Sequence, residues 1–258
     1  MIAVDCEGAA CVVGEPGRAL SNSRNMEFAR EQATRETNAA ARALFDAGAE
    51  QVVIWDNHGD GANLAFDQLD QRCEVLLGTG FSRRFPELDE TYAGVLMIGY
   101  HAMAGTSNAV LAHTYSSKVY RAICVNGLEV GEIALDASVA GEFGVPLIFV
   151  ASDDKGCNEA LNFMPWIKTV ATKRGFGFNC AYSKHPSVVE AEIYQTVRQA
   201  VDRLAEMKPF VFAHPVQIEI HFKRYIHLVK ARICRQGWRI VGRKILSASL
   251  SDMGQWKC

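Results

Sequence analysis

The sequence lacks the features that would place it in a membrane or in an oxidising compartment. No apolar run reaches the length of a membrane span, and acids at positions 5 and 7 interrupt the apolar core that a secretory signal would need. The eight cysteines include no Cys-x-x-Cys pair. We therefore expect a cytoplasmic protein with no membrane partner, whose thiols are reduced and mostly buried.

Neither sign of charge dominates, since the net charge is −2, but its distribution is uneven. From His221 onward nine basic residues accompany a single acid, Asp252, whereas the earlier part holds 18 basic and 28 acidic residues. We interpret the basic segment as a solvated face. A nucleic-acid partner is not expected, because the basic and aromatic residues lack the organised placement that such binding needs.

Strand-like and helix-like segments alternate along the chain. Continuous apolar runs, typical of strands buried on both faces of a parallel sheet, occur at 2–5, 51–56, 73–78, 93–100 and 145–152. Helices are predicted over 25–47, closed by Gly48, over 131–144 and over 187–206, the last with Pro186 near its start. The segment 121–130 predicts a hairpin that turns at Asn126-Gly127.

These elements predict a three-layer α/β/α fold with a largely parallel sheet. A smaller, partly intertwined C-terminal α+β subdomain is expected to accompany it. We place a metal-binding catalytic part in residues 1–165 and a second, divergent and basic subdomain in residues 166–258.

Polar side chains follow three of the predicted strands at the point where each strand ends. Asp5 and Glu7 follow the first strand, Asp56 and His58 the second, and His101 a third. Side chains two apart on a strand point to the same side, so Asp5 and Glu7 should lie together. Since ligand sites collect beyond the carboxyl ends of parallel strands, we expect these groups at one edge of the sheet.

Two further residues are candidates for the same edge. Glu132 follows Gly131 at a helix start, and His113 lies in the segment VLAHTY. Each candidate has an ordinary structural explanation by itself, such as a turn cap or a carboxylate at a helix N-terminus. A set of two imidazoles and three carboxylates drawn from these candidates suits zinc, manganese or cobalt, and five ligands fit a pair of ions about 3.5–4 Å apart better than one ion. Hydrolysis is the chemistry expected of such a pair.

Five motifs carry a resemblance to a known family. They occur in the order VDCEG, WDNHGDG, IGYHA, VLAHTY and NGLEVGEIALDASVAGEFGVP, and RNMEFAREQATRETN precedes the second of them. This pattern resembles the DppA-type zinc D-aminopeptidases, a family of self-compartmentalising bacterial metallopeptidases. The resemblance covers residues 2–160 and fades from about residue 210 onward.

The resemblance implies two zinc ions per subunit, with Mn²⁺ or Co²⁺ as alternatives. The metal ligands that it implies are Asp5, Glu7, His58, His101 and Glu132, with Asp5 bridging the two ions. His113 falls on the histidine that the family uses in catalysis. It would assist a metal-activated hydroxide, by transferring a proton to the leaving amine or by orienting the tetrahedral intermediate.

The expected activity is therefore an aminopeptidase acting on short peptides or aminoacyl amides, with an N-terminal D-residue. The resemblance also implies a homo-oligomer, a decamer of two stacked pentamers. Two alternatives stay open: a dinuclear metal hydrolase of another amide or of a phosphoester, and a non-catalytic α/β ligand-binding protein. The second is disfavoured because no GxGxxG fingerprint follows the first strand.

Overall fold

The computed structural model describes residues 1–254 and 256 and contains two β-sheets. The strands of the larger sheet are β1 (Ile2–Val4), β2 (Val53–Asp56), β3 (Glu74–Leu76), β4 (Val95–Ile98), β7 (Leu147–Asp153), β8 (Lys168–Gly177) and β9 (Cys180–Ser183). They lie in the order β3-β2-β1-β4-β7-β8-β9, and every pair is parallel except β8 with β9.

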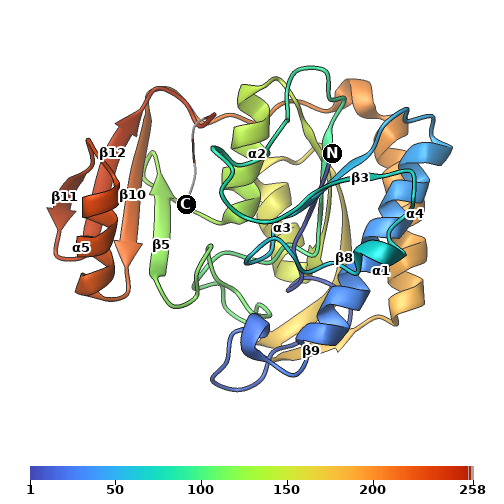
Figure 1. Cartoon of the computed structure of the whole chain (residues 1–258), viewed down its shortest axis with the longest axis horizontal. Helices are drawn as coiled ribbons and strands as arrows, with labels where there is room; N and C mark the ends of the chain where they lie inside the picture. The colour runs from blue at the N-terminus through green and yellow to red at the C-terminus, as the bar shows by residue number, and fades with distance from the viewer. Residues whose placement is uncertain (255, 257–258) are drawn as a thin grey trace.

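Helices cover both faces of this sheet. The helices are α1 (Met26–Asp46), α2 (Glu132–Glu142), α3 (Asp154–Phe163) and α4 (Pro186–Asp202). Helices α1 and α4 pack together on one face, and α2 and α3 lie on the other (Figure 1). The three-layer α/β/α architecture with a largely parallel sheet is therefore confirmed.

The strands are apolar without interruption because successive side chains enter different layers. In β1, Ile2 and Val4 belong to the core under α1 and α4, whereas Ala3 belongs to the core around α2. Helix α2 is buried from Glu132 to Gly141, since the larger sheet and the second sheet share its core. The side of β1 that Ala3 faces is thus the side on which α2 begins.

The predicted helices are present with small changes at their ends. Helix α1 ends one residue before Ala47, and Gly48 follows in the left-handed region with φ of 95°. Helix α4 stops at Asp202, and a separate 3-10 turn, Leu204–Glu206, contains the last part of the expected pattern. Within residues 1–254, no helix is both long and apolar enough to span a membrane.

Two expectations are corrected. The run at 73–78 forms only the short β3, which is partly exposed because it lies at the edge of the sheet beside β2. The cysteines are not mostly buried. Cys6 and Cys157 are, but three others are exposed at loop positions and element ends, namely Cys11, Cys180 and Cys234. Cys258 lies outside the described residues.

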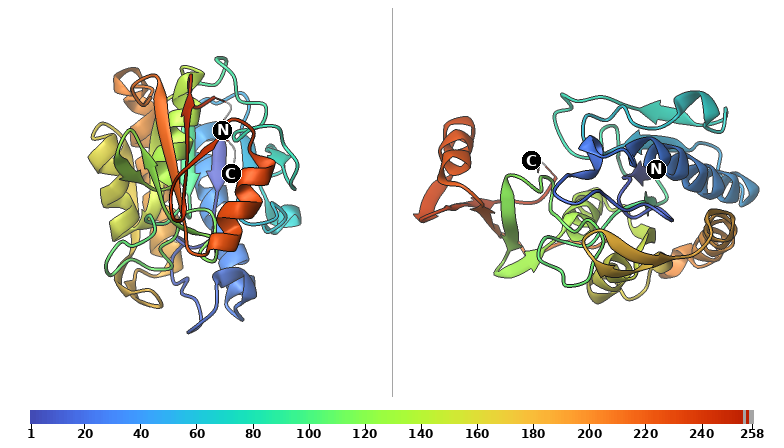
Figure 2. Two further views of the ribbon diagram at one scale, coloured as in Figure 1. Left: turned by 90° about the vertical axis from the view of Figure 1, so that its left-hand side faces the viewer. Right: turned by 90° about the horizontal axis from the view of Figure 1, so that it is seen from below.

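The second sheet forms a narrower lobe beside the three layers (Figure 2). Its strands are β5 (Tyr120–Val125), β6 (Leu128–Val130), β10 (Val216–Phe222), β11 (Arg239–Gly242) and β12 (Ile245–Leu250), with α5 (Tyr225–Cys234) packed on β10 and β12. The strands lie in the order β11-β12-β10-β5-β6, and each adjacent pair is antiparallel. The predicted hairpin is confirmed as β5–β6, with positive φ at Asn126 and Gly127.

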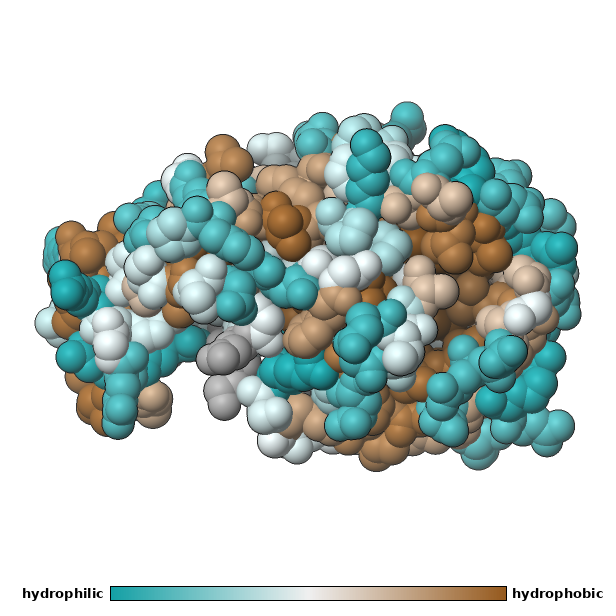
Figure 3. Space-filling view, turned by 90° about the horizontal axis from the view of Figure 1, so that it is seen from above, coloured by the Kyte–Doolittle hydropathy of each residue, from teal (hydrophilic) through white to brown (hydrophobic). Residues whose placement is uncertain are grey.

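The two sheets are intertwined along the chain. Strands β8 and β9 follow residue 165 but belong to the larger sheet, and β5 and β6 precede it but belong to the smaller one. The boundary between the sheets in space therefore does not coincide with residue 165, and the division of the chain there stays a prediction about folding units. Seen from above, hydrophobic and hydrophilic residues are mixed over the surface of the lobe (Figure 3).

The loops that follow β1 and β4 meet at two glycines. The Gly8 amide donates a hydrogen bond to the Gly99 carbonyl at 2.7 Å, and a Cβ on Gly99 would lie 2.1 Å from the Asp5 carbonyl oxygen. Gly99 also has a φ of 72°, in the left-handed region. Only glycine allows this approach, which places the residues after β1 against those after β4.

Replacing Gly99 by alanine should therefore disturb both the fold and the placement of its neighbours. We expect Gly99→Ala to lower the free energy of unfolding by about 3 kcal/mol, the sum of the left-handed backbone cost and a backbone clash. Gly105→Ala is the matched control, because Gly105 has a φ of 87° with no heavy atom within 4 Å of the added Cβ. It should cost only about 1 kcal/mol in denaturant unfolding. Equal losses would show that the close approach is unimportant.

Candidate metal centre and cavity

Three neighbouring parallel strands deliver polar side chains to one edge of the larger sheet. Asp5 and Glu7 follow β1, His58 follows β2, and His101 follows β4, with β1 lying between the other two. All four side chains are buried, although each lies beyond the end of its strand. The sheet order therefore brings together residues that are up to 96 positions apart, as the strand-end pattern predicted.

Glu132 and His113 reach the same place from other elements. Glu132 is the first residue of α2, on the side of the sheet that Ala3 and Asp5 face. Its Oε1 accepts a hydrogen bond of 2.7 Å from the Tyr115 amide. His113 lies in the irregular segment between β4 and β5, and its ring stacks on that of His101 with centroids 4.0 Å apart and planes 12° apart.

The six side chains form two adjoining groups. Within each group, one potential ligand atom from each residue lies within 4.8 Å of the others; the groups are Asp5, Glu7 and His58, and His101, His113 and Glu132. The groups adjoin through His101, whose Nε2 lies 3.4 Å from Asp5 Oδ2 and 3.3 Å from Glu132 Oε1. In the first group, His58 Nε2 lies 3.3 Å from Glu7 Oε1.

Hydrogen bonds assign the free nitrogen of two rings. His101 Nδ1 lies 3.0 Å from the Ala102 carbonyl, and His113 Nδ1 lies 2.8 Å from the Leu111 carbonyl. A carbonyl accepts only, so both Nδ1 atoms donate. In the neutral rings the Nε2 atoms then have the lone pairs, and that of His101 faces the two carboxylates.

Burial and mutual charge shift the carboxyl pKa values in different directions. Burial, with the Glu7 charge beside it, raises the pKa of Asp5 well above its ordinary value. Burial also opposes ionisation of Glu7, but the adjacent His58 holds the Glu7 pKa well below its usual range. Burial acts likewise on Glu132, yet His101 outweighs it and lowers the Glu132 pKa to about 2.

The imidazoles respond to these carboxylates. Burial alone would lower the pKa of His58, but Glu7 raises it to about 10. Burial is similarly outweighed at His101, where Glu132 and Asp5 raise the pKa well above its ordinary value. Burial and the His101 charge lower the pKa of His113. The carboxylates thus favour the protonated, positively charged forms of His58 and His101.

The donor set fits divalent cations. Three buried atoms of the cluster have no hydrogen-bond partner within the described residues, namely Glu7 Oε2, His58 Nδ1 and His101 Nε2. Buried polar atoms are rarely left unpaired, and each exception calls for an explanation. Carboxylate oxygens mixed with imidazole nitrogens are the ligands that zinc takes in catalytic sites.

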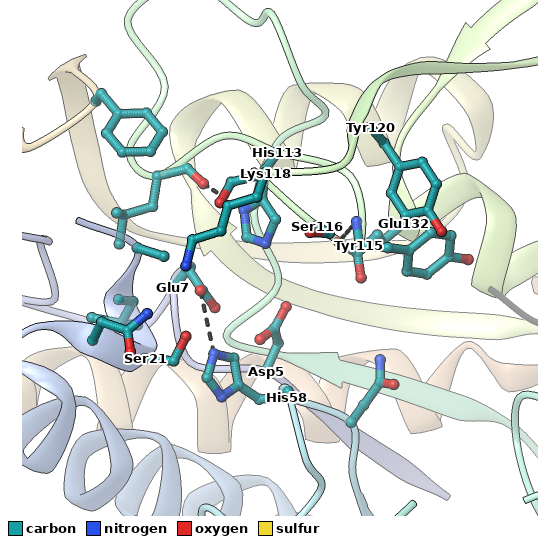
Figure 4. Close-up of a pocket in the computed structure, with 18 of the residues that line it drawn as sticks. Asp5, Glu7, Ser21, His58, His113, Tyr115, Ser116, Lys118, Tyr120 and Glu132 are labelled. Atoms are coloured by element: carbon teal, nitrogen blue, oxygen red, sulfur yellow. Dashed lines mark hydrogen bonds and ion pairs between the residues drawn. The ribbon is translucent and has the colours of Figure 1, made fainter. Parts of the chain in front are cut away.

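Five residues of the cluster form the floor of a cavity of about 480 Å³, namely Asp5, Glu7, His58, His113 and Glu132. Figure 4 shows Lys118, Ser116 and Tyr120 on the wall opposite His58 and Asp5. The wall also includes apolar side chains, of which Leu20, Leu111 and Phe178 are the largest. A volume in this range accommodates a small molecule or a short peptide.

Comparisons with known proteins show the family to which the chain belongs. The sequence matches the family model of the D-aminopeptidases over residues 1–255. The chain belongs to the D-aminopeptidase family. It is 30% identical over 227 residues to a D-aminopeptidase of Bacillus subtilis strain 168, over 87% of this chain and 81% of that relative.

A solved structure is similar over nearly the whole chain. The Zn-dependent D-aminopeptidase DppA from Bacillus subtilis, a self-compartmentalizing protease, superposes with a TM-score of 0.91 at 27% identity, covering 99% of this chain and 93% of the other. The resemblance inferred from the five motifs is confirmed. As a member of the D-aminopeptidase family, the chain is a hydrolase of the metallopeptidase class.

One residue at a strand end lies outside the cluster. The Asp56 carboxylate accepts hydrogen bonds from the amides of Asn63 and Leu64 and from the Asn63 side chain. The Asp56 carboxylate therefore orders the loop that contains His58. Unlike His58, it does not line the cavity. Strand-end position alone does not distinguish these two roles.

A network behind the cluster was missed by sequence reasoning. Arg84 forms a bidentate ion pair with Asp136, both bonds 2.6 Å, and Tyr100 donates to the same carboxylate at 2.7 Å. Asp136 lies one helical turn after Glu132, and the Arg84 guanidinium lies against the Trp55 and Tyr115 rings. Arg84 occurs in an irregular segment without periodicity, so its sequence position carries no signal.

The loop after the acidic pair is held by two buried ionisable side chains. Lys173 Nζ donates to the carbonyls of Glu7, Ala9 and Val12 at 2.6, 2.6 and 2.8 Å. Glu36, on α1, accepts from the Ala10 amide at 2.8 Å. Burial raises the pKa of Glu36 to about 7, although its hydrogen bonds favour the charged form. The residues after Glu7 are thus held in place by β8, through Lys173, and by α1, through Glu36.

The raised pKa of Glu36 predicts a pH dependence of stability. Because its folded-state pKa lies above the ordinary 4.5, Glu36 stabilises the fold fully below about pH 4.5, and this contribution is lost as the pH rises through about 7. In Glu36→Gln this dependence is absent. The free energy of unfolding of the wild type, relative to the variant, should fall by about 2 kcal/mol between about pH 5 and pH 8.

Denaturant unfolding of both proteins at a series of pH values measures this difference, in which other titrating groups cancel. Glu31→Gln, on the exposed side of the same helix, is the control and should follow the wild type. A constant difference between wild type and Glu36→Gln across this range would contradict the assignment.

Proposed function

We propose that the chain is a two-zinc aminopeptidase that removes an N-terminal D-residue from short peptides or aminoacyl amides. The observation that carries the proposal is the adjoining pair of ligand groups, joined where His101 meets Asp5 at 3.4 Å. Six clustered donors exceed what one catalytic zinc takes, and a carboxylate between two groups is suited to bridge two ions. The Zn-dependent relative supports zinc as the metal.

Each proposed ligand has a place in this scheme. Asp5 would bridge the two ions, Glu7 and His58 would complete one, and His101 and Glu132 the other. The backbone positions them: the Ala102 carbonyl orients the His101 ring, and the Tyr115 amide holds Glu132 Oε1. Such partners behind the ligands fix the ring nitrogen and carboxylate oxygen that face an ion.

Bound zinc ions would supply a Lewis acid for the scissile carbonyl and lower the pKa of water. The protein residues then bind and orient the peptide and move protons. His113 presents Nε2, because its Nδ1 donates to the Leu111 carbonyl. We assign to it proton transfer: Nε2 would take a proton from the attacking water and give it to the leaving amine. One observation supports a second role, that of a metal ligand: His113 lies in the group with His101 and Glu132.

The assembly and location of the protein are part of the proposal. The relative is a self-compartmentalizing protease, and we propose that this chain likewise forms a homo-oligomer. Several large apolar side chains are exposed on the narrower lobe, where a second subunit would bury them: Leu128, Ile226, Ile233, Ile240 and Val241. Its size as a decamer and its cytoplasmic location stay predictions.

Removing the bridging carboxylate should remove metal and activity together. We expect Asp5→Ala to contain at most one zinc ion per chain, against about two in the wild type. Hydrolysis of a D-Ala-D-Ala-type dipeptide should fall by more than about 100-fold, since losing even the partners behind ligands costs 10–100-fold. Elemental analysis and a coupled amino-acid assay measure the two quantities, with the exposed Asp202→Ala as control. Full metal content with retained activity would exclude the bridging role.

His113→Ala separates the two readings of that residue. Loss of a proton-transfer group predicts a 10²–10⁴-fold decrease in kcat, on the order of what general acid–base catalysis contributes, with zinc content unchanged. Loss of a zinc ion in the variant would instead make His113 a ligand.

The substrate class is tested with a panel assayed in added zinc. It contains D- and L-aminoacyl amides, D- and L-dipeptides and a phosphomonoester. Turnover confined to the D-amides and D-dipeptides is the expected outcome. Turnover of the phosphoester alone would replace the proposal by the alternative of a metal phosphoesterase.

A further inference from the structure

Lys118 is a cation on the cavity wall that the proposed chemistry leaves unused. It lies in the segment before β5, lines the cavity and is exposed to solvent. Figure 4 shows its side chain extending into the cavity above the floor on which Glu7 and His58 lie. Within residues 1–254 and 256, its ammonium group has no hydrogen-bond acceptor or ion-pair partner.

The other cations around the cavity are already committed. Arg84 also lines it, but both of its bonds to Asp136 are 2.6 Å long and Asp136 is fully buried. The two histidines that line it, His58 and His113, belong to the ligand groups with the carboxylates. The carboxylates that line the cavity are Asp5, Glu7 and Glu132, all proposed metal ligands. When divalent ions neutralise them, no further carboxylate among the described cavity-lining residues remains to pair with Lys118.

The backbone around Lys118 is held in place by the second sheet. Lys223, at the end of β10, donates its amide to the Val119 carbonyl at 2.9 Å and its Nζ to the Ser117 carbonyl at 2.6 Å. The Val119 and Tyr120 amides both donate to the Ser116 carbonyl at 3.1 Å. Residues on both sides of Lys118 are thus fixed, while its four-carbon side chain can move.

We propose that Lys118 binds the C-terminal carboxylate of a short peptide whose scissile bond lies at the metal centre. This inference rests on the proposed aminopeptidase function and makes Lys118 a specificity-determining residue. The floor engages the N-terminal end of the substrate, and a single cation across the cavity pairs with the carboxylate at the other end. The enzyme then prefers free-acid dipeptides to the same dipeptides with an amidated C-terminus.

The experiment compares D-Ala-D-Ala with D-Ala-D-Ala-amide in the zinc-loaded enzyme. The readout is the ratio of kcat/KM for the acid to kcat/KM for the amide. Lys118→Met should lower this ratio about tenfold, mainly through KM, because the contact is made equally in ground and transition states and is solvent-exposed. Lys118→Arg should keep most of the ratio, and Lys118→Glu should invert the preference.

A salt series gives a readout that a purely structural role would not affect. The KM for the acid should rise with ionic strength in the wild type and respond much less in Lys118→Met, since salt screens an exposed charge pair. Lys230→Met, an exposed lysine on α5, is the matched control and should leave ratio and salt dependence unchanged.

Each outcome decides between the two levels of the proposal. Equal losses on acid and amide in Lys118→Met, or no change in the ratio, would overturn the role of Lys118 while leaving the aminopeptidase function intact. A wild-type enzyme that hydrolyses neither substrate would overturn the proposed function itself, and the role of Lys118 with it.

Discussion

Mutual repulsion among three buried carboxylates is the constraint on which the architecture of the site depends. Asp5, Glu7 and Glu132 converge where little water can screen them, and His101 Nε2 lies within 3.4 Å of two of them. Such a cluster is stable only with positive charge inside it. Protons on His58 and His101 can provide that charge, and divalent ions can replace them, so the geometry that brings the carboxylates together also favours metal binding.

The protein keeps the carboxylates together by fixing the backbone behind them. Gly8 and Gly99 let two loops approach within hydrogen-bonding distance, and Lys173 binds three carbonyls of the loop that follows Glu7. Glu36 holds the same loop from α1. These contacts use buried charge and the absence of a side chain, both of which are costly elsewhere. Because the backbone is held in this way, the repelling carboxylates cannot move apart.

The second sheet contributes to the site without supplying a metal ligand. Its strand β5 begins at Tyr120 on the cavity wall, and Lys223 at the end of β10 holds the segment that carries Lys118. The C-terminal part of the chain, from about residue 210 onward, is therefore connected to the wall opposite the cluster. Changes in this lobe can alter which peptides fit while the floor stays as it is.

The apolar runs by themselves determined the parallel sheet, and the polar residues at the strand ends predicted the convergence of Asp5, Glu7, His58 and His101. Both were predictable because the apolar pattern of a buried strand and the position of its end are local properties of the sequence. Only the tertiary structure placed the Glu132 side chain beside His101, stacked His113 on that ring, and turned Asp56 into its own loop. Likewise, nothing local marks Arg84, Lys173 or Lys118. Their roles arise from burial and from partners distant in the chain, which sequence spacing does not encode.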